Sequence, residues 1–398
     1  MRLAVMLCIY CVITAAGLLL LRGPLKRVLG DGKASRFFGK LIFAVLLVMI
    51  AFPVAGGLVP FGPACFFFQK WGNIFIGFFI YFFGCLLIVR TLLLPVHLVH
   101  RIRKHSAWKP SRAASSALVF GLLALSVFTN VLGYRTARDV RVTNYTLPKE
   151  TLGQTESRRI ILIGDLHIGV NSVTQLYRDT VDLINEQDAD LILIAGDILT
   201  STYEGMGDPE ACASILSEMQ SSSGNYVVYG NHDVEEPLLG GFSTIGPENA
   251  VRHPEIEGFL KKCGWELLTD EVVSLPGWNG LYLAGRRDES RPGDGVRERM
   301  PLKELLTGID PSSPILLIQH EPSDLEELDS LGVDLSVSGH THDGQIFPGN
   351  IISRMFVPLS YGLESYGKSL ALVTSGIGFY GPPIRVGTIS EIVVIDLI

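Results

Sequence analysis

Acidic residues are nearly missing from the first part of this chain of 398 residues. Asp31 and Asp139 are the only acids before Glu150, although the whole chain carries 40 acids against 33 Lys and Arg residues. The N-terminal part is therefore basic and the remainder acidic. This division predicts a membrane anchor followed by a soluble domain. It argues against a nucleic-acid-binding protein, because the acidic part lacks the basic surface that phosphate backbones require.

Cysteine is scarce in the acidic part, where only Cys212 and Cys263 occur. The other four cysteines lie in the apolar N-terminal part. Cys212 and Cys263 could form a disulfide only if the fold placed them together in an oxidising compartment, and we expect buried free thiols instead.

Four stretches lack any Asp, Glu, Lys or Arg, and each is long enough to cross a bilayer as a helix, which takes about 20 residues. They are Leu3 to Leu21, Leu41 to Gln69, Trp71 to Val89 and Ala113 to Tyr134. The end of the second stretch, from Pro60 to Phe68, predicts an interfacial loop. The first stretch is too long for a signal peptide, and the lack of charge within the stretches argues against a transporter. We predict an all-α transmembrane bundle over residues 1–137.

Basic residues gather in the first and third loops between these stretches. Because Lys and Arg are retained on the cytoplasmic side, both chain ends and the soluble domain are predicted to be extracytoplasmic. Arg135, Arg138 and Arg141 favour the opposite orientation. The loop residues are Arg22, Lys26, Arg27, Lys33, Arg36 and Lys40 in the first loop, and Arg90, Arg101, Arg103, Lys104, Lys109 and Arg112 in the third.

Residues 138–157 are polar and unpatterned, which predicts a linker. From residue 158 to the end, short apolar runs such as Arg159 to Gly164 and Leu191 to Gly196 predict strands buried on both faces. Val173, Leu176 and Val181 recur at helical spacing between them. Because strands outnumber helices late in this part, a mixed α/β sandwich is the expected architecture of residues 158–398.

Metal-binding residue types follow these apolar runs, one set after another. The carboxyl ends of sheet strands meet in one crevice, so these side chains are expected to converge. A single histidine of this kind is usually an ordinary core residue, but the joint occurrence predicts a metal centre. Its nitrogen and oxygen donors suit manganese, iron or zinc. The residues are Asp165, His167, Asp197, Asn231, His232, Asp233, His320, His340 and His342.

This set of motifs resembles the calcineurin-like metallophosphoesterases. The D-x-H, GD, GNH-D, H and GHxH motifs occur in that order within residues 158–398. The resemblance implies a four-layer αββα sandwich with two divalent metal ions, a substrate-contacting His232, and Asp233 orienting that histidine. It implies Asp165, His167, Asp197 and His342 around one ion, and Asp197, Asn231, His320 and His340 around the other. A carboxylate shared by both ions holds them close enough for two-metal phosphoester chemistry.

The C-terminal segment resembles the membrane-attached branch of the same family. The matching segments are Gly376 to Gly378, Pro382 to Arg385 and Ser390 to Ile392, while Asp343 stands where many relatives carry glycine. That branch includes enzymes that split the pyrophosphate of a diacylated UDP-glucosamine, and members of unknown substrate. The resemblance therefore implies a phosphate-containing, lipid-linked substrate.

Three functions follow from these patterns. The leading hypothesis is a membrane-anchored phosphoesterase acting on a phosphate ester or pyrophosphate bond of a lipid. The second is a tethered phosphodiesterase of small soluble or cyclic nucleotides, and the third is a non-catalytic receptor built on the same fold. The apolar segment Ile346 to Tyr361 favours the first if it forms a lip against the bilayer, with ordinary packing of a loop onto the core as the alternative.

Overall fold

The computed structural model describes residues 2–102, 110–239, 241–246, 250–293 and 295–398. The chain divides into two compact units. The helical unit consists of Met1–Gly133, Leu238–Thr244 and Gly381–Pro383, and the α/β unit of Tyr134–Pro237, Ile245–Tyr380 and Ile384–Ile398.

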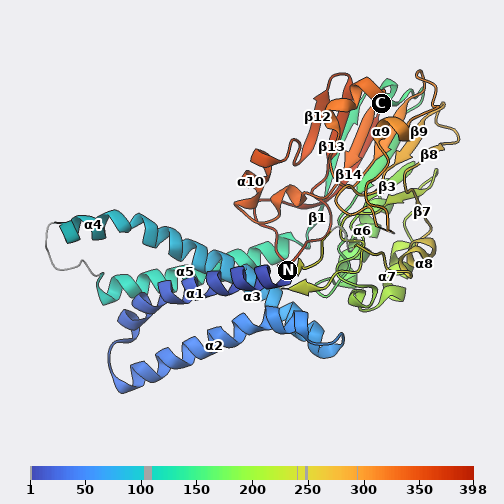
Figure 1. The fold of residues 1–398 in the computed structure, drawn as a ribbon. Helices are drawn as coiled ribbons and strands as arrows, with labels where there is room; N and C mark the ends of the chain where they lie inside the picture. The colour runs from blue at the N-terminus through green and yellow to red at the C-terminus, as the bar shows by residue number, and fades with distance from the viewer. Residues whose placement is uncertain (1, 103–109, 240, 247–249, 294) are drawn as a thin grey trace. The chain divides into compact units, whose positions relative to one another are not determined.

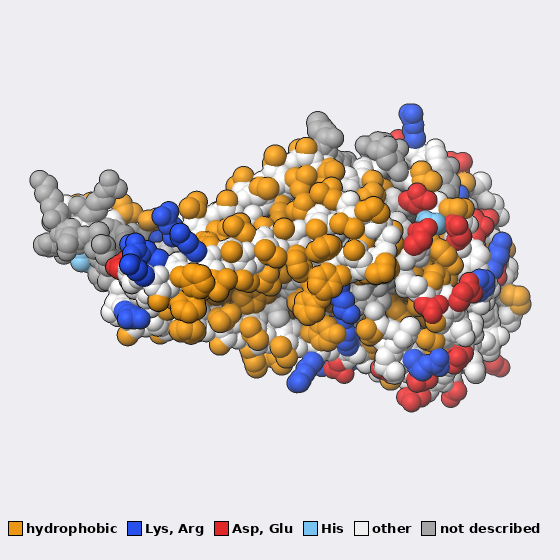
Figure 2. Space-filling view, turned by 90° about the horizontal axis from the view of Figure 1, so that it is seen from below, with side chains coloured by type: hydrophobic (Ala, Val, Ile, Leu, Met, Phe, Trp, Pro, Cys, Tyr) orange, Lys and Arg blue, Asp and Glu red, His pale blue; other side chains and the backbone are white. Residues whose placement is uncertain are grey.

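Among the described residues, five helices make up most of the helical unit (Figure 1). Four of the helical segments are long and apolar enough to cross a membrane, as the sequence predicts. Hydrophobic side chains cover most of the visible face of this unit, as expected for a surface that meets lipid (Figure 2). The helices are α1 (Arg2–Leu29), α2 (Lys33–Leu58), α3 (Pro63–Leu92), α4 (Leu94–Ile102) and α5 (Arg112–Thr136).

Helix α3 begins earlier than predicted. Pro63 stands in its first turn, where proline lacks only an amide that would be unpaired anyway. Phe66, Phe67 and Phe68 are therefore helical, and the predicted interfacial loop shrinks to the turn before Pro63. Arg103, Lys104 and Lys109 of the predicted third loop lie outside the described residues.

Two six-stranded sheets form the centre of the α/β unit. The first has the order β1-β14-β2-β3-β4-β7, with β2, β3, β4 and β7 parallel and β14 antiparallel to β2. The second has the order β12-β13-β11-β10-β9-β8, parallel from β13 to β9 with an antiparallel strand at each edge. The first sheet contains β1 (Val140–Leu147), β14 (Ser390–Leu397), β2 (Arg158–Ile163), β3 (Leu191–Ala195), β4 (Asn225–Val228) and β7 (Trp265–Leu267). The second contains β12 (Gly362–Tyr366), β13 (Ser369–Val373), β11 (Leu335–Ser338), β10 (Ile315–Ile318), β9 (Tyr282–Gly285) and β8 (Glu271–Ser274).

Three apolar clusters hold this unit together in four layers. Ile160, Leu193 and Leu316 belong to the cluster between the two sheets. A second cluster joins the outer face of the first sheet to α6 (Thr174–Asn185), α7 (Pro209–Leu216) and α8 (Ile256–Lys262). The third covers the outer face of the second sheet with α9 (Leu302–Leu305) and short 3-10 turns. The α/β sandwich implied by the resemblance is therefore confirmed. The free thiols Cys212 and Cys263 are buried in the second of these clusters.

The prediction of a linker at residues 138–157 was wrong for much of that segment. Val140–Leu147 forms β1, which pairs in parallel with β14 along its whole length. Lys149–Leu152 then forms a 3-10 turn whose Leu152 is fully buried. The edge position explains why the sequence looked unpatterned, because an edge strand keeps polar side chains at solvent-facing positions.

Candidate metal centre

The predicted ligands come from loops that directly follow five strands. Parallel strands β2, β3 and β4 lead into the loops of Asp165, Asp197 and Asn231. In the second sheet, parallel strands β10 and β11 lead to His320 and His340. Because parallel strands end at the same edge, both sheets deliver their ligands to one place.

Asp165, His167 and His342 form the first cluster of ligand atoms, all within 4.8 Å of one another. The Nε2 atoms of His167 and His342 lie 2.9 Å apart, and His342 Nε2 is 3.7 Å from Asp165 Oδ1. Thr200 Oγ1 lies 2.8 Å from the Nδ1 atom of His167 and so holds the far side of that ring. Such a contact leaves Nε2 of His167 free to face the centre of the cluster.

Asp197, His320 and His340 form the second cluster, again within 4.8 Å. Asn231 completes it, since its Oδ1 is 3.0 Å from His320 Nε2 and 2.9 Å from His340 Nδ1. The Nδ1 atom of His320 lies 2.7 Å from the carbonyl oxygen of Ala195, which it can reach only as a donor. The Nε2 atom of a neutral His320 is then an acceptor that points at the other ligands.

Asp197 lies between the two clusters. Its Oδ2 atom is 3.5 Å from His167 Nε2 and 3.2 Å from His320 Nε2, so one carboxylate faces ligands of both sets. Lone pairs of buried nitrogens and oxygens would repel one another at these separations unless protons or cations lay among them. The donor set thus fits two divalent cations, in the arrangement that the resemblance implies.

The backbone around the ligands is unusual. Asp165, His167, Asp197, His340 and His342 all have φ between 47° and 73°, a left-handed region that residues other than glycine seldom adopt. Strained backbone of this kind persists at functional sites because the surrounding structure enforces it.

Two glycines leave room for the carboxylates. A Cβ atom at Gly339 would lie 2.5 Å from Asp165 Oδ2, and one at Gly230 would lie 2.2 Å from Asp197 Oδ1. Any larger residue at either position would push a ligand carboxylate out of place. Glycine therefore precedes Asn231 and His340 because a side chain at either position would clash with a ligand carboxylate.

Burial shifts the pKa values of several proposed ligand side chains. Burial raises the pKa of Asp165 to about 7, and it lowers the pKa of His167 to about 3 and that of His340 to about 4. His320 differs: burial lowers its pKa, but the neighbouring carboxylates, Asp197 first among them, together raise it well above its usual value. Asp165 and His320 thus both hold a proton more firmly than the free side chains do. Neutral imidazoles and ionised carboxylates are the forms that bind divalent ions, so metal loading displaces these protons.

Beside the metal ligands, His232 contacts Glu236 rather than Asp233. His232 Nδ1 lies 2.6 Å from Glu236 Oε1, and the other oxygen of Glu236 accepts a hydrogen bond of 2.7 Å from Arg291. The Asp233 carboxylate accepts instead from the backbone amides of Ile198, Leu199 and Gly230. Asp233 therefore does not contact the His232 ring, although the resemblance implies that it orients this ring. Asp233 fixes the β3 and β4 loops, while Glu236 orients the imidazole.

The sequence analysis did not single out Glu236, Arg291 or Tyr380. Tyr380 stacks on His232 with ring centroids 4.1 Å apart. Glu236 follows His232 by four residues and is fully buried. An acidic residue so soon after the GNH-D motif was the sequence feature that could have indicated its role. Tyr380 and Arg291 lie far away in the sequence and carried no such signal.

Arg385, which belongs to the C-terminal Pro382 to Arg385 segment, supports the loops around the candidate metal centre. Its side chain is almost completely buried and donates to the carbonyl oxygens of Ser375, Gly376 and Gly378. Its Nη2 atom also lies 3.2 Å from Nδ1 of His342. Arg385 therefore holds the loop that runs against Asp165 and His342, and it supports the centre from behind.

Comparison with known proteins agrees with this geometry. Residues 158–344 match the family model described as calcineurin-like phosphoesterase. The chain is 28% identical over 324 residues to a transmembrane protein with metallophosphoesterase domain of Danio rerio, covering 79% of this chain and 69% of that protein. It is also 30% identical over 253 residues to an uncharacterized metallophosphoesterase of Helicobacter pylori strain ATCC 700392 / 26695, covering 60% of each chain. The α/β unit is therefore similar to the calcineurin-like phosphoesterases, and the helical unit, like the relative from Danio rerio by its name, carries helices long and apolar enough to cross a membrane.

Proposed function

We propose that this protein is a membrane-anchored phosphoesterase that hydrolyses a phosphate ester or pyrophosphate bond of a lipid-linked substrate with two divalent cations. The position of Asp197 carries the proposal, because its Oδ2 atom faces His167 on one side and His320 on the other. The proposed ligands of one ion are Asp165, His167, Asp197 and His342, and those of the other are Asp197, Asn231, His320 and His340. Two such cations, whether manganese, iron or zinc, would neutralise phosphate charge and activate the attacking water.

In this proposal His232 acts on the substrate rather than on the metal. Glu236 holds its Nδ1 atom, which leaves Nε2 as the atom available to a bound phosphate. The pKa of His232 is raised, because Asp197 and Glu236 outweigh the lowering effect of burial. A protonated Nε2 can stabilise phosphoryl charge and then protonate the departing oxygen. Tyr380, stacked on the ring, keeps His232 in place.

Helix α10 supports a lipid-linked substrate. It begins seven residues after His342, at Gly349, and exposes Ile351, Ile352, Met355 and Phe356, each at least half exposed. Arg354 of this helix pairs with Asp343, next to His342, with Nη2 3.0 Å from Oδ2. Exposed apolar side chains on a helix fastened beside the ligands are what an enzyme needs to meet its substrate at a bilayer surface.

We also propose that the α/β unit is extracytoplasmic. Arg22, Lys26, Arg36 and Lys40 line one pocket at the turn between α1 and α2. Basic residues gathered at such a turn are retained in the cytoplasm, which leaves both chain ends on the other side.

The test uses the purified full-length protein in lipid nanodiscs. We expect two divalent ions per chain by elemental mass spectrometry, and hydrolysis of bis(p-nitrophenyl) phosphate that a chelator abolishes. Higher kcat/KM on a phospholipid pyrophosphate than on a cyclic nucleotide would support the lipid assignment, and the reverse order would favour the soluble-nucleotide alternative. A protein that binds no ions and turns over none of these substrates would be a receptor, and the proposal would be wrong.

A further inference from the structure

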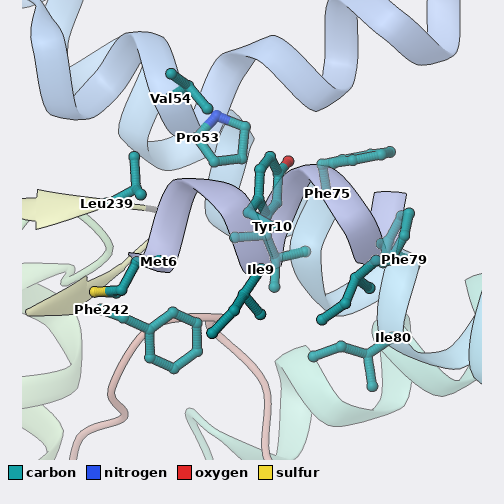
Figure 3. A pocket seen from close by; sticks show the side chains of 12 residues that line it. Met6, Ile9, Tyr10, Pro53, Val54, Phe75, Phe79, Ile80, Leu239 and Phe242 are labelled. Atoms are coloured by element: carbon teal, nitrogen blue, oxygen red, sulfur yellow. The ribbon is translucent and has the colours of Figure 1, made fainter. Parts of the chain in front are cut away.

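Two hollows of the helical unit differ in their chemistry. The first is an apolar cavity of about 280 Å³, walled by α1, α2, α3 and the hairpin formed by β5 (Leu238–Leu239) and β6 (Phe242–Ser243) (Figure 3). The one polar side-chain group among its lining residues is the Tyr10 hydroxyl, which already donates a hydrogen bond of 2.8 Å to the carbonyl oxygen of Ile50. This lining accepts hydrocarbon, but it carries no charge that would select one lipid over another.

The second hollow, which we call the basic pocket, has a volume of about 670 Å³ and lies at the turn between α1 and α2. Such a volume is within the range of about 300 to 1,000 Å³ that is usual for small-molecule sites. Four basic side chains and one acid line the pocket, which leaves three net positive charges. The basic residues are Arg22, Lys26, Arg36 and Lys40, and the acid is Asp31.

The basic side chains form two pairs, one on each helix. Arg22 and Lys26 are separated by four residues on α1, so their side chains project from the same face of that helix. Arg36 and Lys40 have the same spacing on α2. Because all four line one pocket, two rows of cations border the same space. Like charges at this spacing repel one another, and an anion between the rows would relieve the repulsion.

Part of the wall of the basic pocket is apolar. Leu25, Leu29 and Phe43 contribute to the lining, and Leu25 is only 6% exposed. Gly39 keeps the space open, since a Cβ at that position would already lie 3.4 Å from Leu29 Cδ1. A free inorganic anion would gain nothing from an apolar wall, whereas a phospholipid offers both phosphate and hydrocarbon.

The position of the basic pocket along the helices matches the level of lipid phosphates. Arg22 directly follows the charge-free stretch Leu3 to Leu21, and Lys40 directly precedes the stretch Leu41 to Gln69. Charged side chains at the ends of membrane-spanning helices lie at the level of the headgroups. Lys and Arg side chains gather at one end of the helical unit, at the edge of its hydrophobic surface (Figure 2).

Retention of positive charge on one side of the membrane does not by itself explain this arrangement. Retention depends on the number of basic residues in a loop, not on what they line. Of the six basic residues between Leu21 and Leu41, four line one pocket, whereas Arg27 and Lys33 do not. The acid Asp31 lies 3.3 Å from Lys26, but the two side chains are 85% and 72% exposed, so this ion pair is weak and a phosphate can replace it.

We propose that the basic pocket binds the headgroup of an anionic phospholipid, with phosphate between the two rows of cations and the start of the acyl chains against Leu25 and Phe43. Three net positive charges suit a headgroup with two phosphates better than a headgroup with one. A lipid bound in this way contacts both α1 and α2 and stabilises the helical unit. The inference concerns the helical unit alone and does not depend on the proposed phosphoesterase function.

Native mass spectrometry of the full-length protein in detergent tests the proposal. Dioleoyl phosphatidylcholine, dioleoyl phosphatidylglycerol and tetraoleoyl diphosphatidylglycerol are added separately, and inorganic phosphate is a fourth probe that lacks the chains. We expect one tightly bound anionic lipid per chain, with diphosphatidylglycerol binding about tenfold or more tightly than phosphatidylcholine. Equal affinities for the charged and the zwitterionic lipids would overturn the proposal, and so would inorganic phosphate that binds as tightly as the lipid.

Two double variants separate the basic pocket from general surface charge. Arg36→Gln combined with Lys40→Gln should weaken binding of diphosphatidylglycerol about tenfold or more. Arg27→Gln combined with Lys33→Gln is the matched control, because it removes the same charge from the same loop but outside the pocket. The control should leave the affinity almost unchanged. Equal losses in both variants would show that the lipid is attracted by the total charge of the loop and would contradict a defined site.

Gly39→Leu tests the shape of the basic pocket while every charge is kept. Leucine favours a helix more than glycine does, so the variant is expected to fold. The larger side chain fills the space beside Leu29 and should weaken lipid binding about tenfold, and the rise in melting temperature that diphosphatidylglycerol causes in the wild type should be lost. Undiminished binding in Gly39→Leu would show that the lipid does not enter the pocket.

Discussion

The Nδ1 atom of His232 lies 2.6 Å from the Oε1 atom of Glu236, four residues further along the chain. This contact sets the orientation of the imidazole that faces the proposed substrate. Arg291 holds the second oxygen of Glu236 and also donates a hydrogen bond of 2.9 Å to the carbonyl oxygen of Asn231, so the pair is linked to a proposed metal ligand.

Replacing Glu236 by glutamine should lower kcat by about 10- to 100-fold, the usual loss when a group that orients a catalytic imidazole is changed. KM and bound metal should change little, because Glu236 contacts neither cluster of ligands. Steady-state kinetics and metal analysis measure both quantities. Glu235→Gln is the control, since Glu235 is the adjacent acid and is half exposed. An equal loss in both variants would show that Glu236 has no special role.

Replacing Asp197 by alanine should remove both ions and reduce kcat by at least about 1,000-fold, because its carboxylate faces both sets of ligands. Elemental mass spectrometry and turnover of bis(p-nitrophenyl) phosphate measure the two effects. The exposed Asp182 on α6 serves as the control through Asp182→Ala. Retention of two tightly bound ions in Asp197→Ala would contradict the bridging assignment.

Replacing Gly339 by alanine should weaken metal binding without removing any charge. The new Cβ would lie 2.5 Å from Asp165 Oδ2, so the carboxylate would have to move. Metal titration by calorimetry should show at least about tenfold weaker binding of one ion. Gly258→Ala is the matched control, because nothing lies within 4 Å of a Cβ at that position in α8 and alanine suits a helix. Equal affinities in the two variants would show that the close contact is tolerated.

Replacing Phe356 by serine should lower kcat/KM for dodecyl p-nitrophenyl phosphate, a diester with a long alkyl chain, more than for methyl p-nitrophenyl phosphate. Phe356 is 78% exposed on α10, and a hydroxyl there would weaken insertion of the helix into the bilayer surface by about 2 kcal/mol, or about 30-fold. Val251→Ser, at an apolar position that is 56% exposed, is the control. A parallel fall for both esters would indicate a folding defect instead of a lost membrane contact.

An epitope tag after Ile398 should be accessible to antibody on intact cells, whereas a tag inserted between Gly30 and Asp31 should need permeabilised membranes. The reason is the gathering of basic residues at the turn between α1 and α2. Immunofluorescence on both tagged proteins measures the difference. The opposite pattern would place the α/β unit in the cytoplasm and would show that Arg135, Arg138 and Arg141 determine the orientation of the protein in the membrane.

Much of this protein followed from the sequence alone. Apolar stretches without charge identify membrane helices because hydrocarbon tolerates few ionised groups, and ligands such as Asp165 and His342 stand in short motifs at strand ends, where local order suffices to recognise them. Tertiary structure alone decided the rest. Strand β1 was not predicted because an edge strand carries polar side chains that interrupt the apolar pattern of a buried strand. The contact of Glu236 with His232 depends on a loop, and a loop has no periodic sequence pattern. The packing of Leu239 against helix α2 likewise joins segments more than 150 residues apart, since a Cβ at Gly57 would lie 3.5 Å from Leu239 Cδ1. Contacts of that kind leave no local signature, since only packing of the folded chain brings the segments together.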